Sequence, residues 1–138
     1  MIPEAAALGA GLPKQTKQHY EQVCDLLVNE LGCDVYVKTI YVGFSIDGEM
    51  VSAVYPRRDF LEIAMALPED VEGREFKDAT HLTWPTMPVA IEVRTTDDLT
   101  GAIGHLESAA ARVVAGEHDV RRPNDHFIGR VKRGNSWS

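Results

Sequence analysis

The fold is decided by residues 35–67, which read VYVKTIYVGFSIDGEMVSAVYPRRDFLEIAMAL. This stretch predicts three consecutive strands, at residues 35–46, 50–55 and 60–67. The first two strands flank Asp47-Gly48, and Asp-Gly between alternating apolar residues is a strong hairpin signal because both residues tolerate positive φ. The second and third strands flank the turn sequence Pro56-Arg57-Arg58-Asp59. Connections this short predict an antiparallel arrangement.

Strand side chains alternate between the two faces of a sheet, so each strand predicts its own buried face. In residues 35–46 the apolar even positions are expected to face the core: Tyr36, Ile40, Val42, Phe44 and Ile46. In residues 60–67 the positions expected to share one face are Leu61, Ile63, Met65 and Leu67. The opposite face carries Ser45, Glu62, Ala64 and Ala66. The side chains on this face are small and few of them are charged, so we expect another part of the protein to cover about half of the face.

The remaining periodic segments complete the predicted domain. Apolar residues at helical spacing predict a helix over residues 13–31 and a second one that Thr96 caps and that ends near Gly116. Residues 89–95 predict a fourth strand. The order α-β-β-β-β-α favours an α+β two-layer sandwich, with a mainly antiparallel four-stranded sheet and two helices on one face. Residues 1–12 are expected to be a loose leader, residues 13–116 a single domain, and residues 117–138 a basic tail.

Length and composition limit the class of protein. A chain of 138 residues with 44% hydrophobic content is expected to form one domain around a single core. No run approaches the roughly 18 apolar residues of a membrane helix, and the N-terminal segment lacks the basic start of a signal peptide. We therefore expect a cytoplasmic location and no membrane partner. Cys24 and Cys33 are expected to be buried thiols, too far apart along a helix and turn for a disulfide.

Charge is distributed unevenly along the chain. Residues 1–116 carry 9 Lys/Arg and 18 Asp/Glu, whereas residues 117–138 carry 5 and 3. An acidic body argues against nucleic-acid binding as the main activity. The tail interleaves its basic residues with Phe127 and Trp137. Docking on the body or in a dimer, disorder, and nucleic-acid contact all remain open for this tail.

The sequence contains none of the common catalytic signatures. It has no phosphate-binding P-loop, no nucleophile elbow, no zinc-protease helix motif and no dinucleotide-binding fingerprint. The five histidines show no metal-ligand spacing at a helical period. We therefore expect neither a metal nor a cofactor.

One irregular segment, residues 68–88, is the place where a site is expected, because long irregular loops are often functional. It contains Asp78, Thr80, His81 and Trp84, and five residues on strands or turns are expected to approach it: Lys38, Tyr41, Tyr55, Arg57 and Arg58. Histidine with a nearby carboxylate transfers protons, and an aromatic side chain with arginine binds planar or anionic ligands. In the structural alternative, Trp84 fills one end of the core, His81 bonds to loop backbone, and the two arginines are solvated.

Four segments together resemble a known family. They are residues 37–44 (VKTIYVGF), 61–65 (LEIAM), 76–84 (FKDATHLTW) and 91–99 (IEVRTTDDL). In this order they resemble a bacterial domain-of-unknown-function family loosely labelled "predicted transport protein", over about residues 15–114. The resemblance implies the αββββα order, in a domain that stands alone or follows others in proteins of nuclease or defence type. It supplies no catalytic residues.

Three functions follow as hypotheses. The first is a small soluble binding module for a small molecule or a protein partner, homodimeric through the outer sheet face or the tail. The second is an enzyme of proton transfer or hydrolysis that uses His81 with Asp78, Tyr41 or Tyr55. The third is nucleic-acid contact through the tail.

Overall fold

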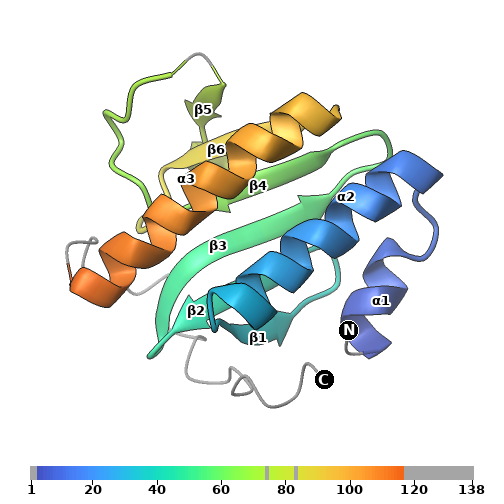
Figure 1. Ribbon diagram of the computed structural model, residues 1–138, viewed down its shortest axis with the longest axis horizontal. Coiled ribbons are helices and arrows are strands. Elements are labelled where there is room, and N and C mark those ends of the chain that lie inside the picture. Colours follow the sequence, from blue (N-terminus) through green and yellow to red (C-terminus); the bar gives the residue numbers. More distant parts are fainter. Residues whose placement is uncertain (1–2, 74, 83, 117–138) are drawn as a thin grey trace.

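The computed structural model describes residues 3–73, 75–82 and 84–116. Within these residues the chain forms a six-stranded antiparallel sheet, with α2 and α3 lying across one face (Figure 1). The helical elements are α1 (Pro3–Gly9), α2 (Lys14–Asp25), the π-helix η1 (Leu26–Glu30), the 3-10 helix η2 (Thr80–Leu82) and α3 (Thr96–Ala115). The strands are β1 (Asp34–Val37), β2 (Val42–Ile46), β3 (Glu49–Pro56), β4 (Leu61–Met65), β5 (Phe76–Asp78) and β6 (Val89–Val93).

The sheet order is β1-β2-β3-β4-β6-β5, and every neighbouring pair is antiparallel. The predicted α+β class with an antiparallel sheet is confirmed. The predicted four strands and two helices are wrong, because the described chain has six strands and three α-helices. The additional elements are α1, β5 and a division of the first predicted strand into two.

That division also reverses the sidedness predicted for residues 35–37. The chain turns back at residues 38–41, closed by a hydrogen bond from the Lys38 N–H to the Tyr41 carbonyl oxygen at 2.9 Å. In the resulting hairpin Val35 lies opposite Phe44, and Tyr36 lies opposite Gly43. Val35, at an odd position, therefore faces the core together with Phe44, at an even position. Ile40, predicted to be buried, lies in the turn with 58% of its surface exposed.

The central strands keep the predicted faces. Ile63 on β4 lies opposite Ile91 on β6, and Leu61 lies opposite Val93, all beneath the helices in the main core. The apolar stripe of α3 covers this side, with Leu99, Leu106 and Val113 buried. The helix and the sheet bury these two apolar surfaces against each other, and this burial stabilises the two layers.

The helix ends follow from local sequence. Gly32 and Gly116 both have φ of +73°, the left-handed conformation that glycine adopts after a helix. At the start of α3, Thr95 and Asp98 form a reciprocal capping box, one residue earlier than the predicted Thr96 cap. Within the predicted leader, Pro3–Gly9 forms α1. This short helix is held by the Tyr20 hydroxyl, which donates to the Ala5 carbonyl oxygen at 2.6 Å.

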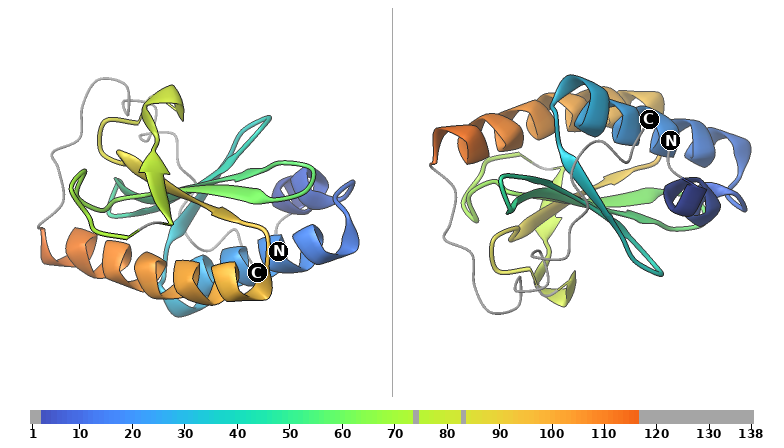
Figure 2. Two further views of the ribbon diagram at one scale, coloured as in Figure 1. Left: turned by 90° about the horizontal axis from the view of Figure 1, so that it is seen from above. Right: turned by 90° about the horizontal axis from the view of Figure 1, so that it is seen from below.

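The outer face of the sheet, opposite the helices, is covered by residues that follow β5. Figure 2 shows β5 and the segment after it on this side of the sheet. Its buried residues include Leu82, Trp84 and Met87. Ser45, Ala64 and Ala66, which the predicted dimer surface was to use, are each at most 1% exposed in the single chain. The sheet face is therefore not an open surface, and the other predicted route to a homodimer, through the tail, falls outside the described residues.

Cys24 and Cys33 are free and buried, as predicted. No described helix combines the length and the apolar character needed to cross a membrane. The predictions for the tail at 117–138, including docking and nucleic-acid contact, fall outside the described residues.

Candidate functional site: a charged network on the outer sheet face

Glu62 lies on the outer face of the sheet, as the second residue of β4. Strand alternation turns it away from the core that Leu61 and Ile63 enter, yet it is only 3% exposed. Its partner across the strand pair is Glu92 on β6. Two carboxylates directly opposite each other repel, and a buried one is costly unless it is paired. This position therefore requires nearby cations.

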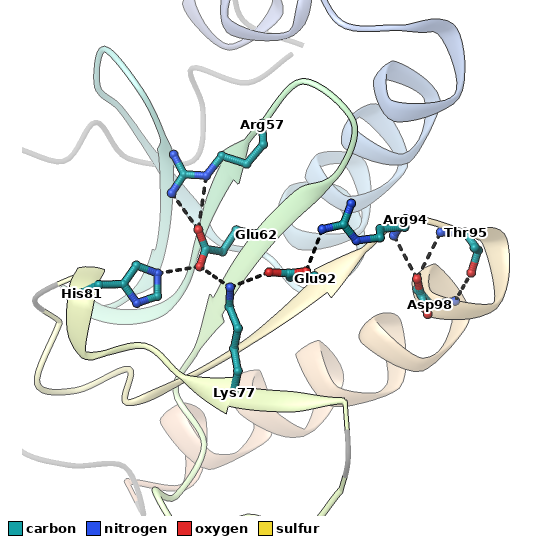
Figure 3. A network of polar contacts seen from close by, with 8 residues as sticks. All are labelled: Arg57, Glu62, Lys77, His81, Glu92, Arg94, Thr95 and Asp98. Atoms are coloured by element: carbon teal, nitrogen blue, oxygen red, sulfur yellow. Dashed lines mark hydrogen bonds and ion pairs between the residues drawn. The ribbon is translucent and has the colours of Figure 1, made fainter.

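Two cations, Arg57 and Lys77, supply that charge, and His81 adds a further contact (Figure 3). Arg57 donates to Glu62 Oε1 from Nη2 at 2.7 Å and from Nε at 3.2 Å. Lys77 Nζ lies 2.9 Å from Glu62 Oε2, and His81 Nε2 lies 2.6 Å from the same oxygen. Both carboxylate oxygens are thus engaged. We call the six residues Arg57, Glu62, Lys77, His81, Glu92 and Arg94 the Glu62 network.

The network continues to the start of α3. Lys77 Nζ also donates to Glu92 Oε2 at 2.6 Å, so one ammonium group bridges the two facing carboxylates. Arg94 Nη2 donates to Glu92 Oε1 at 3.0 Å, and its guanidinium lies 4.1 Å from the centre of the Phe60 ring. The Arg94 N–H donates to Asp98 in the capping box. Charges of alternating sign thus run from η2 to the helix cap.

Separate elements bring these side chains together. Arg57 lies in the turn after β3, which is closed by its N–H donating to the Phe60 carbonyl oxygen at 2.9 Å. Lys77 lies on β5, which pairs with β6 so that Lys77 is opposite Ala90. His81 follows in η2. The edge strand β5 therefore delivers both Lys77 and His81 to Glu62.

The contacts shift the pKa values of Glu62, Glu92 and Lys77. Burial alone would raise the pKa of Glu62, but hydrogen bonds from Lys77, Arg57 and His81 outweigh burial and hold the pKa at about 2. The hydrogen bond from Lys77 lowers the pKa of Glu92. Burial opposes the charge of Lys77, yet its bonds to Glu92 and Glu62 raise the pKa. At neutral pH Glu62 is a fixed negative charge and not a proton donor.

An aromatic cluster adjoins the network at Arg57. Trp84 Nε1 donates to the Tyr55 hydroxyl at 2.8 Å, and the Tyr41 ring lies 5.0 Å from Tyr55 and 5.8 Å from Trp84. The Arg57 guanidinium lies 5.2 Å from the Tyr55 ring centre. Burial raises the pKa of Tyr55, so its hydroxyl stays neutral. Trp84 is buried in the core, as the structural alternative expected for this side chain, and Tyr55 is buried beside it.

The predicted site residues divide into three groups. Arg57 and His81 join the Glu62 network, and Tyr41, Tyr55 and Trp84 form the aromatic cluster. The other three, Lys38, Arg58 and Asp78, lie outside both groups among the described contacts. Lys38 lies 5.2 Å from the Tyr36 ring centre, Arg58 is exposed in its turn, and Asp78 is exposed on β5. Thr80, also predicted near the site, begins η2.

Sequence reasoning paired His81 with Asp78. Asp78 is close in sequence, but the described partner of His81 is Glu62, 19 residues away. Lys77, Glu92 and Arg94 were not predicted as site residues, and Arg94 pairs with Glu92. A usable signal was present: Glu62 is the one charged residue in the buried strand LEIAM. Such a carboxylate requires partners.

Metal binding finds no support in the described part of the chain, which has no group of three or more His, Cys, Asp or Glu side chains able to hold an ion. Comparisons of the chain with known protein families, with curated proteins and with solved structures found no match. The resemblance to the "predicted transport protein" family stays a prediction. Function is therefore argued from the geometry alone.

Proposed function

We propose that this chain is a small binding module that holds an acidic group, a carboxylate or a phosphate, against the Glu62 network. The observation that carries the proposal is that three basic side chains are fixed by one buried carboxylate while remaining accessible. The side chains of Arg57, Lys77 and His81 are 35%, 37% and 51% exposed, whereas that of Glu62 is 4% exposed. Fixed and exposed donors are what a recognition site for anions needs.

Each of the two permanent cations keeps hydrogen-bonding capacity within the described contacts. A lysine ammonium has three hydrogens, and Lys77 directs two of them at Glu62 and Glu92. An arginine has five N–H bonds in a planar fork, and Arg57 uses only its Nε and Nη2 groups on Glu62. Because both side chains are already ordered, binding costs them little further conformational entropy.

The chain offers a matched pair of arginines for the test. Arg57 and Arg58 are neighbours in one turn, but only Arg57 belongs to the network. We expect titration with inorganic phosphate or succinate, followed by ¹H–¹⁵N NMR, to give saturable shifts at residues 57, 77 and 81. Arg57→Ala should weaken this binding about tenfold, the loss expected for one charge-assisted hydrogen bond, whereas Arg58→Ala should leave it unchanged.

Two results would reject the acidic ligand. One is the absence of saturable shifts in the network with either probe. The other is an equal effect of Arg57→Ala and Arg58→Ala, which would indicate general charge attraction. Because Arg57 also stabilises Glu62, circular dichroism of the variant must first show the folded spectrum. Lys77→Gln provides a second variant on a different element if Arg57→Ala does not fold.

A second function, proton transfer by His81, is favoured by one specific observation. His81 Nε2 lies 2.6 Å from a buried carboxylate that stays ionised. A carboxylate in this position orients an imidazole and leaves the other ring nitrogen for a substrate. This is the enzyme hypothesis with Glu62 in the place given to Asp78.

The enzyme hypothesis has its own readout. In a screen of ester, amide and phosphoester substrates, His81→Ala should abolish any turnover while the melting temperature changes little, since His81 is half exposed. His105→Ala, which removes a histidine paired with Glu75, is the matched control and should retain the activity. Turnover that survives His81→Ala would exclude this role. If the wild type binds anions but turns over no substrate, the binding module would be the only one of the two proposed functions that is supported.

A further inference from the structure

A second feature of the surface lies away from the Glu62 network, where α1 faces the turn between β1 and β2. An open groove with a volume of about 530 Å³ runs between them. One wall is α1 and the other is the turn, which lie next to each other at one end of the sheet (Figure 1). The groove is lined by Glu4, Ala7, Leu8, Val37, Lys38 and Thr39.

Both walls are held firmly, so the groove exists before anything binds. On α1, Ala5 is completely buried and its carbonyl oxygen accepts the hydrogen bond from Tyr20. Gly9 packs so closely that an added Cβ would lie 2.6 Å from the Tyr20 ring. The opposite wall is closed by the hydrogen bond between Lys38 and Tyr41. A preformed surface binds without an ordering cost.

An exposed isoleucine stands directly beside the groove. Ile40 follows Thr39 in the turn and is 58% exposed; Val114, at the far end of α3, is the other large apolar side chain that is exposed in the described residues. A single exposed apolar residue is ordinary on a protein surface. Next to an apolar groove, however, Ile40 supplies a projecting side chain of the kind that such a groove accommodates.

The charges on the two walls are of opposite sign. Glu4 lies on α1 and Lys38 lies on the turn, so a two-fold axis beside the groove would bring each Lys38 to Glu4 of the partner subunit. An interface of this kind uses the same patch on both copies. Within its own chain Lys38 also contacts the Tyr36 ring, 5.2 Å from the ring centre.

We infer that this groove receives the β1–β2 turn of a second copy of the chain, with Ile40 of each copy inserted into the groove of the other and Lys38 paired with Glu4 of the partner subunit. The patch is one short helix and one turn, well below the roughly 1,200–2,000 Å² buried by stable complexes. The dimer therefore forms reversibly and depends on concentration. This inference does not depend on the proposed anion site.

Sedimentation velocity of the full chain over a concentration series tests the inference. The wild-type average mass should rise from that of a monomer towards that of a dimer. Ile40→Asp should weaken association about tenfold or more, because a charge replaces an apolar side chain at the contact. Val114→Asp makes the same change at the other exposed apolar residue and should associate like the wild type.

Charge reversal identifies the two walls. Lys38→Glu and Glu4→Lys should each weaken association, since each places like charges opposite one another, and the double variant should restore it. A wild type that stays monomeric throughout, equal behaviour of Ile40→Asp and Val114→Asp, or a double variant without recovery would each overturn the inference. All four positions are exposed, so these variants should keep the wild-type circular dichroism spectrum.

Discussion

Glu62 is the single side chain on which the outer face depends most. Replacing it with glutamine keeps its size but removes the charge that Arg57, Lys77 and His81 share. We expect Glu62→Gln to lower the free energy of unfolding at pH 7 by about 2 kcal/mol, less than for a fully buried pair, because the cations reach water. Glu92→Gln, at a side chain that is 33% exposed, should cost less. Urea denaturation measures both.

The stabilisation by Glu62 also has a defined pH dependence. Its pKa is about 2 in the folded chain, against an ordinary value of 4.5. A lowered folded-state pKa means that the stabilisation is complete above about pH 4.5 and is lost as the pH falls towards 2. The difference between wild type and Glu62→Gln should therefore shrink over this interval. A difference that stays constant down to pH 2 would contradict the ionised state assigned to Glu62.

Two buried serines on neighbouring strands form a second matched pair. The Ser52 hydroxyl donates to the Ala64 carbonyl oxygen at 2.7 Å, whereas the Ser45 hydroxyl is buried without a hydrogen-bond partner in the described structure. Ser52→Ala should lower the free energy of unfolding by about 1 kcal/mol. Ser45→Ala should leave it unchanged or raise it by up to about 1 kcal/mol. Thermal or urea denaturation measures both changes. A clear loss of stability in Ser45→Ala would show that the Ser45 hydroxyl does have a hydrogen-bond partner.

The members of the Glu62 network differ in how well sequence could predict them. Arg57 and His81 were predicted because their residue types are chemically distinctive in a turn and a loop. Glu62 and Lys77 were not, because their roles arise only when β5 pairs with β6 and lies next to β4 in space. A pattern along the chain records which face a strand residue takes. It does not record which distant segment arrives to cover that face.

The first hairpin shows the same limit for an element. The turn Lys38-Thr39-Ile40-Tyr41 contains no Gly, Pro, Asn or Asp, the residues that normally indicate a turn. A continuous strand was therefore the natural prediction for residues 35–46. The Asp47-Gly48 turn was predicted correctly, since Asp47 and Gly48 have φ of +51° and +81°. A turn can be predicted from sequence when its backbone conformation requires particular residues such as glycine. It cannot be predicted when ordinary residues adopt the turn conformation.

Helix α3 carries two exposed glycines, Gly101 and Gly104. An added Cβ at either would meet nothing within 4 Å. Gly101→Ala and Gly104→Ala should each raise the free energy of unfolding by about 0.5–1 kcal/mol, because alanine has the higher helix propensity. Urea denaturation tests this. Gly9→Ala is the control and should be destabilising, because its Cβ would clash with Tyr20.

The molecule as a whole was easier to predict than its edges. The apolar periods of α2, α3, β4 and β6 determined the two layers correctly, because these elements bury one clear face each. The elements that were missed, α1 and β5, are 7 and 3 residues long and too short to show a period. They nevertheless form one wall of the groove and deliver two side chains of the Glu62 network. Short peripheral elements thus position both of the proposed binding surfaces.

The two cysteines offer a test of how the whole core opens. Cys24 on α2 and Cys33 after η1 are at most 1% exposed, and burial raises the pKa of both thiols, that of Cys33 to about 12. A buried thiol that stays protonated is unreactive. We therefore expect Ellman's reagent to label neither cysteine in the native protein and both after unfolding in urea. With increasing urea below the transition, both should become reactive with the same apparent free energy, that of global unfolding. Rapid labelling of Cys33 alone, at a rate independent of urea, would instead show that the end of η1, where the Cys33 N–H bonds to Leu27, opens separately from the core.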